Sequence, residues 1–182
     1  KESPIFANVI PDSLRHRIHI PPTRFSGKAR LTPATIRTKA ILEAGDGVLT
    51  LLARLNPNRE LYEGDISIDR FPLSLYLPHD SLGNLSASIR FAGKHYNPTD
   101  SAMYASAELT VDTADYSGYR YTGIAIEANL NRGRVIGEIT STDPNLLTGL
   151  ALSANLSEKK YTATLTGDIH VDLEALHFTT ET

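Results

Sequence analysis

Apolar and polar residues alternate along most of this chain, and this period of two constrains its fold more than any other feature. Over residues 24–31, Phe25, Gly27, Ala29 and Leu31 alternate with charged or polar residues. Successive side chains of a β-strand point to opposite faces, so such a segment buries one face and hydrates the other. The same pattern predicts strands over residues 14–20, 47–55, 62–68, 85–91, 103–111, 119–130, 134–141, 150–156 and 161–173.

Short polar sequences that favour turns separate these strands. Asn56-Pro57-Asn58 and Asp143-Pro144-Asn145 combine the fixed φ of proline with side chains that hydrogen-bond to their own backbone, and residues 97–100 do the same. Residues 131–133 and 157–160 are typical of hairpin tips. About eleven strands at a spacing of roughly 8–15 residues predict an antiparallel, all-β chain.

Two segments are open to a second interpretation. Residues 33–44 contain strong helix formers and end at Gly45, yet apolar residues alternate along them, so we predict a strand. Residues 71–77, between Pro72 and Pro78, fit either an irregular strand or a short helix. Composition does not change along the sequence, so we expect one β-rich domain over residues 1–182.

Composition excludes several classes of function. With 18 Lys and Arg against 21 Asp and Glu, spread along the sequence, nothing predicts a nucleic-acid partner. The absence of Cys removes disulfides, zinc–thiolate sites and cysteine nucleophiles. The longest apolar runs, residues 48–52 and 71–77, are far shorter than the roughly 20 residues of a membrane span. The chain starts without Met or a signal-peptide pattern, so we expect a piece of a larger protein or a mature form.

No motif of a known catalytic or phosphate-binding site is found in the sequence, so we predict no catalytic residues and no cofactor. The best metal candidates are Asp168, His170 and Asp172, which would share one face of a strand. Residues two apart on a strand lie some 7 Å from each other, which favours a solvated outer face over a metal site. A hydrolase would need convergent carboxylates, and we find none.

Aromatic residues offer a second candidate function. Tyr96, Tyr104 and Tyr116 could bind a glycan if the chain were a carbohydrate-binding or adhesin-type β-sandwich module. Most Tyr and Phe residues, however, stand at strand starts or within apolar rows, which favours packing. A single exposed aromatic patch would favour the glycan-binding alternative.

Residues 61–173 contain a recognisable succession of short motifs. Leu61-Tyr62-Glu63-Gly64-Asp65-Ile66 is followed by residues 71–73 and 77–86, then by Gly93, Asp100 and residues 119–130. Gly137-Glu138-Ile139-Thr140-Ser141-Thr142-Asp143-Pro144-Asn145 and residues 161–169 complete it. This succession resembles the repetitive β-rich region of TamB-like proteins (translocation and assembly module subunit family), in the wider AsmA-like group, particularly those of Bacteroidetes; residues 1–60 would be leading strands in the same style.

The resemblance implies a long periplasmic protein, anchored in the inner membrane by an N-terminal helix and involved in outer-membrane biogenesis. Its body would be a curled, taco-like sheet with one apolar face, and an open β-sandwich is the alternative arrangement of the same hairpins. Such proteins are linked to phospholipid transport and to a partner of the Omp85 type in the outer membrane. The resemblance therefore implies that the sheet either shelters phospholipid or other apolar cargo, or acts as part of a scaffold between the two membranes. Anchoring and docking are expected to involve parts of the protein other than this segment.

A continuous apolar stripe could carry lipid, because each CH₂ group moved out of water contributes about 0.8 kcal/mol. A closed sandwich or barrel would use the same residues to pack against each other. An isolated sheet also has exposed edges, so we predict dimerisation or edge-to-edge pairing of the segment. The residues predicted to form the apolar groove are Leu109, Val111, Ile124, Ile126, Leu130, Val135, Ile139, Leu150, Leu152, Leu165, Ile169 and Val171.

Overall fold

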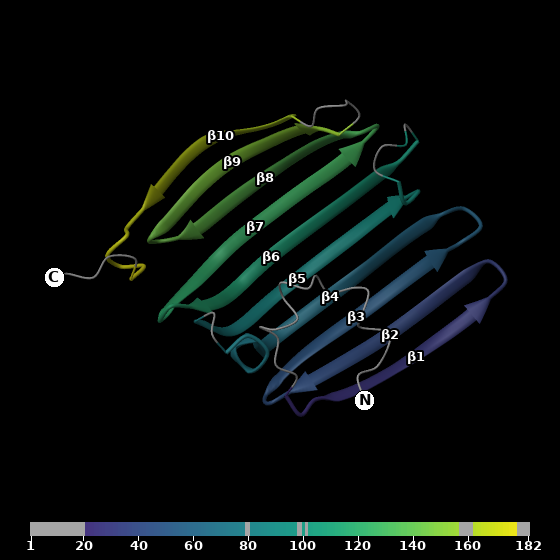
Figure 1. Ribbon diagram of the computed structural model, residues 1–182, viewed down its shortest axis with the longest axis horizontal. Coiled ribbons are helices and arrows are strands. Elements are labelled where there is room, and N and C mark those ends of the chain that lie inside the picture. The colour runs from purple at the N-terminus through teal and green to yellow at the C-terminus, as the bar shows by residue number, and fades with distance from the viewer. Residues whose placement is uncertain (1–20, 79–80, 98–99, 101, 157–161, 178–182) are drawn as a thin grey trace.

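The computed structural model describes residues 21–78, 81–97, 100, 102–156 and 162–177, and these form one antiparallel β-sheet (Figure 1). Ten strands follow one another across the sheet in chain order, each paired with the next. The strands are β1 (Arg24–Thr32), β2 (Thr35–Ala44), β3 (Gly47–Asn56), β4 (Leu61–Pro72), β5 (Leu82–Lys94), β6 (Tyr104–Tyr116), β7 (Tyr119–Asn131), β8 (Arg134–Asp143), β9 (Leu146–Asn155) and β10 (Thr162–Val171). The predicted all-β, antiparallel fold class is therefore confirmed.

The two ambiguous segments are settled by the structure. Residues 35–44 are strand β2, so the alternation decided their conformation in spite of good helix formers. Residues 71–77 divide between the end of β4 and a short 3₁₀ helix, η1 (Leu73–Leu75). The predicted strand at 14–20 and the predicted hairpin tip at 157–160 lie outside the described residues. Among the described residues, no helix has the length and hydropathy needed to span a membrane.

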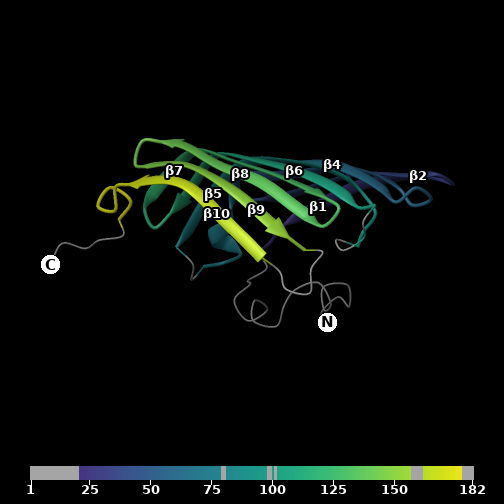
Figure 2. The same ribbon diagram turned by 90° about the horizontal axis from the view of Figure 1, so that it is seen from above.

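Two-residue hairpins and local bulges give the sheet its register and curvature. Arg132 and Gly133 both have positive φ, as do Ser117 and Gly118, which is the type I′ conformation that suits the twist of paired strands. The pairing of β4 with β5 shifts between Ile68 and Phe71, and the pairing of β5 with β6 also shifts near the β6–β7 hairpin. Bulges bend the strands that carry them. Figure 2 shows the resulting sheet, which curves so that its two faces differ in shape.

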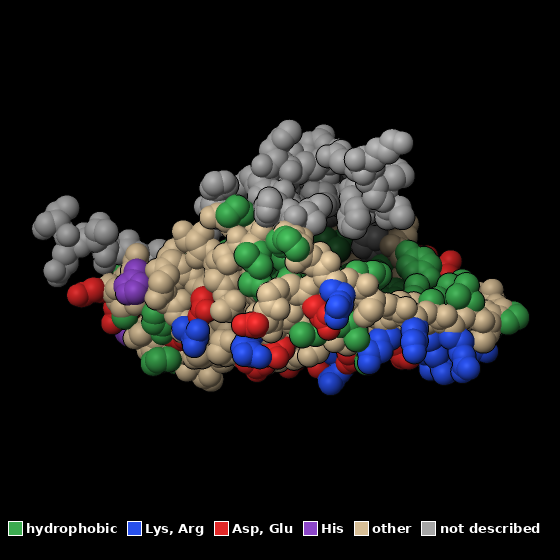
Figure 3. All heavy atoms as spheres, turned by 90° about the horizontal axis from the view of Figure 1, so that it is seen from below, with side chains coloured by type: hydrophobic (Ala, Val, Ile, Leu, Met, Phe, Trp, Pro, Cys, Tyr) green, Lys and Arg blue, Asp and Glu red, His purple; other side chains and the backbone are tan. Residues whose placement is uncertain are grey.

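The register places apolar residues on one face of the sheet throughout its width. One row of directly opposed residues crosses from β2 to β9 without a polar member, and its centre is Ile89, Leu109 and Ile126. Figure 3 shows hydrophobic side chains on the concave side and Lys, Arg, Asp and Glu on the convex side. We call these the apolar face and the polar face. The complete row is Ala40, Leu51, Ile66, Ile89, Leu109, Ile126, Ile139 and Leu150.

The sheet does not close on itself in the part of the chain that is described. Among the described residues, β1 pairs only with β2 and β10 pairs only with β9, so neither edge strand has a described partner on its outer side. The predicted pairing of exposed edges therefore concerns strands that have no second partner among the described residues, and it remains a prediction.

Two small clusters take the place of a large core. In the first, Phe71 is buried and its ring stacks on that of Tyr76 at 5.3 Å, next to η1. In the second, the segment after β10 folds back so that Leu176 is buried, and the backbone N–H of Asp172 donates to the carbonyl of Asn145. Both clusters pack at the same end of the sheet. No other described element covers either of its two faces.

Asp143, at the end of β8, is a fully buried carboxylate in the second cluster, with an exposed fraction of 0%. It accepts hydrogen bonds from the Tyr119 hydroxyl at 2.7 Å, the Thr122 backbone N–H at 2.8 Å and the Asn145 backbone N–H at 3.0 Å. The Thr122 hydroxyl adds a longer bond of 3.3 Å. One side chain thus joins β7, β8 and the β8–β9 turn, which explains why an Asp-Pro-Asn sequence stands there.

Candidate functional site

The apolar face is the first candidate for a functional surface. All twelve residues predicted to form the groove lie on it, because the register aligns them in rows across β6 to β10. Leu109, Ile126 and Ile139 stand in one such row, and Leu152 faces Leu165 in the next. The placement shows that these residues form one continuous surface, and their use as a lipid groove stays a prediction.

Sequence reasoning missed the other half of this surface. The apolar face continues over β2 to β5 through Leu51, Ile66 and Ile89, which occupy the same row as Leu109. At the two edges large apolar side chains are open to solvent: Phe25 is 71% exposed and Ile169 is 57% exposed. The alternation in residues 24–31 and 62–68 was a sufficient signal for this extension. The surface therefore spans all ten strands instead of five.

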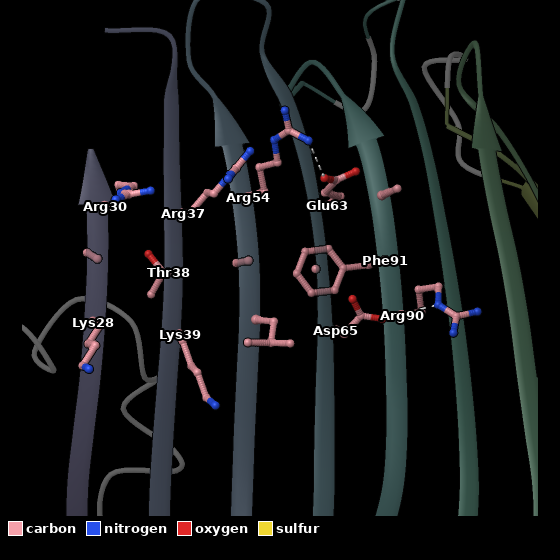
Figure 4. Close-up of a pocket in the computed structure, with 15 residues that line it drawn as sticks. Lys28, Arg30, Arg37, Thr38, Lys39, Arg54, Glu63, Asp65, Arg90 and Phe91 are labelled. Carbon is pink, nitrogen blue, oxygen red and sulfur yellow. Dashed lines mark hydrogen bonds and ion pairs between the residues drawn. The ribbon is translucent and has the colours of Figure 1, made fainter. Parts of the chain in front are cut away.

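A second candidate lies on the polar face, where a shallow, open trough of about 740 Å³ crosses β1 to β5 (Figure 4). Each strand contributes three consecutive residues to it, for example residues 28–30 of β1 and 37–39 of β2. The outer two residues of each triplet project from the polar face, and the middle one belongs to the apolar face. Charged side chains from Lys28, Arg30, Arg37, Lys39, Arg54, Glu63, Asp65 and Arg90 flank the trough, which we call the cationic trough.

Cations outnumber carboxylates in this trough. Arg54 is 3.4 Å from Glu63, and Arg90 bridges Asp65 at 3.4 Å and Glu108 at 3.2 Å. In β1 and β2, by contrast, Lys28 faces Lys39 directly. Like charges opposite each other on a sheet are destabilising, so this end of the trough carries unneutralised positive potential.

The three metal candidates do not form a metal site. Asp168 and His170 lie on the polar face of β10, where both are exposed. Asp172 lies beyond the strand, and its carboxylate accepts a hydrogen bond from the Ala175 backbone N–H at 3.0 Å. Among the described residues, no three His, Asp or Glu side chains are grouped closely enough to hold a metal ion.

The predicted glycan-binding tyrosines are divided between the two ends of the sheet. Tyr104 and Tyr116 are the first and last residues of β6, whose 13 residues span roughly 40 Å. Tyr96 stacks on Tyr62 at 5.8 Å near the Tyr104 end. Tyr119 packs edge-on against a neighbouring tyrosine of β7 at 4.8 Å near the Tyr116 end. The three predicted residues therefore do not form one aromatic platform.

Asp143 and the neighbouring Tyr119 have shifted pKa values, and both belong to the hydrogen-bond network that holds the end of the sheet together. Burial raises the pKa of this carboxyl, but the hydrogen bonds from Tyr119, Asn145 and Thr122 outweigh burial and hold it below its usual value. The hydrogen bond to Asp143 and burial both raise the pKa of the Tyr119 hydroxyl. Because Asp143 is closed to solvent, this network stabilises the end of the sheet and offers no access to a substrate.

No protein-family model, curated protein or solved structure matches this chain.

Proposed function

We propose that this chain is a non-enzymatic segment of a TamB/AsmA-like envelope protein whose concave apolar face shelters the acyl chains of phospholipid. The observation that carries the proposal is the unbroken apolar row from β2 to β9 on a sheet whose described strands stay open at both edges. A closed barrel would fill this row with its own side chains. An open face leaves the row available to an apolar ligand.

The dimensions and chemistry of the face suit an acyl chain. Neighbouring strands lie about 4.8 Å apart, so eight strands present an apolar path of roughly 34 Å, longer than one extended acyl chain. A fully buried CH₂ group gains about 0.8 kcal/mol, and each group of an acyl chain that lies on the open face gains part of this. Such a surface binds by area and needs no specific polar contact, which fits a protein that moves lipids of varied structure.

The resemblance supplies the cellular setting of the proposal. We place the protein in the periplasm, anchored in the inner membrane, as part of the machinery of outer-membrane biogenesis. An Omp85-type outer-membrane protein is its expected partner, through parts of the protein other than these 182 residues.

The proposal is tested by native mass spectrometry of the chain purified from bacteria without harsh detergent. We expect bound phospholipid on the unaltered chain. Leu152→Asp places a charge on the apolar face and should lower the lipid-bound fraction about tenfold or more, because a carboxylate against hydrocarbon is strongly unfavourable.

Ser153→Asp is the matched control, since Ser153 is the next residue of β9 and is exposed on the polar face. It adds the same charge to the same strand and should retain the bound lipid. Circular dichroism of both variants checks that the sheet is intact. A lipid-free chain that takes up no added phospholipid, or equal loss in both variants, would contradict the proposal.

A further inference from the structure

Four cations of β1 and β2 form a compact group at one end of the cationic trough. Lys28 faces Lys39 and Arg30 faces Arg37 in the antiparallel pairing, so the four stand at the corners of one quadrilateral. All four side chains are exposed on the polar face. No carboxylate among the described residues forms an ion pair with any of them, and Figure 4 shows them beside the paired Arg54 and Glu63.

The grouping follows from the length of the β1–β2 turn. Thr32 pairs with Thr35, so only residues 33 and 34 form the loop. Lys28 and Lys39 lie at equal sequence distances on either side of this turn, and so do Arg30 and Arg37. A two-residue hairpin therefore places Lys28 opposite Lys39 and Arg30 opposite Arg37. A single-residue change of loop length would have separated them. The register thus concentrates positive charge that is evenly spread in the sequence.

We propose that the cationic trough binds a phosphate-bearing anion. Adjacent strands lie about 4.8 Å apart and residues two apart on a strand about 6.7 Å, so the four flexible side chains start from an area that one or two phosphate groups would cover. Guanidinium groups bind phosphate through paired hydrogen bonds, and ammonium groups add point charges. A bound phosphate also relieves the repulsion between the directly opposed cations.

The remaining lining favours phosphate over a nucleic-acid strand. Leu52, whose side chain is 46% exposed, and the aliphatic stems of the Lys and Arg side chains form the apolar part of the trough. Phe91 is the one aromatic residue among those that line it, and the ring lies on the apolar face over Gly64, where a Cβ would be 2.5 Å from it. Bases therefore have no ring to stack on from the polar side.

The experiment measures binding of two phosphate-bearing probes to the full chain. Isothermal titration with pyrophosphate tests a soluble anion. Co-sedimentation with phosphatidylcholine vesicles, with and without phosphatidic acid, tests a lipid headgroup. The difference between the two vesicle compositions measures the contribution of net anionic phosphate, because phosphatidylcholine is zwitterionic whereas phosphatidic acid carries a net negative charge.

Arg30→Gln combined with Arg37→Gln should weaken binding of the responding probe about tenfold or more, because paired charge-assisted hydrogen bonds are lost. Arg132→Gln combined with Arg134→Gln makes the same charge change at the β7–β8 hairpin, where both residues are exposed. This control should alter binding by no more than about twofold. Added salt should weaken the interaction of the unaltered chain.

The outcomes separate the sources of the anion and the two proposals. A response to pyrophosphate indicates a soluble or generic phosphate, and a response to phosphatidic acid alone indicates a headgroup on a surface; either supports the proposal. The proposal is overturned if neither pyrophosphate nor phosphatidic acid binds, or if the Arg30/Arg37 variant binds the probe as well as the Arg132/Arg134 variant does. Glu127 and Glu138 face each other on the polar face, so Arg30 and Arg37 could instead bind these two carboxylates in a second copy of the chain. The proposal is also overturned if the Arg30 and Arg37 changes abolish only such self-association and leave phosphate binding unchanged. Leu152→Asp does not change the cationic trough, so loss of phospholipid in that variant tests the apolar face and not the phosphate site.

Discussion

Replacing Asp143 with alanine should lower the free energy of unfolding by about 3–5 kcal/mol, the largest effect we expect from a single side-chain truncation. The carboxylate is fully buried and accepts bonds from the Thr122 and Asn145 backbones and from the Tyr119 hydroxyl. Truncation leaves these three partly buried donors without their acceptor. Urea denaturation at neutral pH measures the loss.

The pH dependence of this effect follows from the sign of the pKa shift. Burial raises the pKa of Asp143, but its hydrogen bonds lower it further, so the folded pKa lies below the unfolded value of about 3.9. Its contribution to stability is therefore complete above that unfolded value and is lost as the pH falls through the lower folded pKa. The stability gap between the unaltered chain and Asp143→Asn should persist from about pH 7 to 5 and narrow below about pH 4. If this difference in stability stayed constant into strong acid, the negative charge of Asp143 would not be what stabilises the network.

Replacing Gly47 with alanine should also be strongly damaging, with a loss of about 2–4 kcal/mol in the free energy of unfolding. A Cβ at Gly47 would lie 2.5 Å from the Cα of Phe71 and 2.6 Å from the carbonyl oxygen of Arg70. Both are backbone atoms of β4, so the strand itself would have to move. Urea denaturation again provides the measurement.

Gly149 in β9 offers a matched control for this prediction. A Cβ at Gly149 would meet nothing within 4 Å. Gly149→Ala should therefore be neutral or stabilise the sheet by up to about 1 kcal/mol, through the lower conformational entropy of the unfolded chain. Equal losses at Gly47 and Gly149 would mean that strand flexibility, and not the close approach to β4, determines the cost.

The strands could be predicted from the sequence because alternation is a local property. Residues 47–55 and 119–130 show it, and they lie within β3 and β7. Even β2, rich in helix formers, follows it, because cross-strand neighbours such as Leu51 opposite Ala40 reward the extended form. The positions of the groove residues on one face followed from the same pattern.

Register and closure could not be predicted in this way. Alternation tells which side of a strand is dry, but it does not tell whether another sheet, a ligand or solvent meets that side. The cationic trough was missed for a related reason: Arg30 and Arg37 meet only because a two-residue turn lies between β1 and β2. Alternation over residues 33–44 does not indicate a turn at residues 33 and 34, so it does not reveal that the charges are symmetrical about that turn. Asp143 was recognised as a turn residue, whereas its role as a buried acceptor depends on the distant Tyr119 and Thr122.

Photolabelling shows directly whether acyl chains lie on the concave apolar face. A phospholipid with a diazirine in its acyl chain is bound and activated, and the labelled residues are mapped by mass spectrometry. We expect labels on Ile126, Ile139 and Leu150, which form one row of the apolar face, and few labels on the adjacent Glu127 and Glu138 of the polar face. Labels distributed equally over both faces, or none above the level of a soluble diazirine, would contradict this expectation.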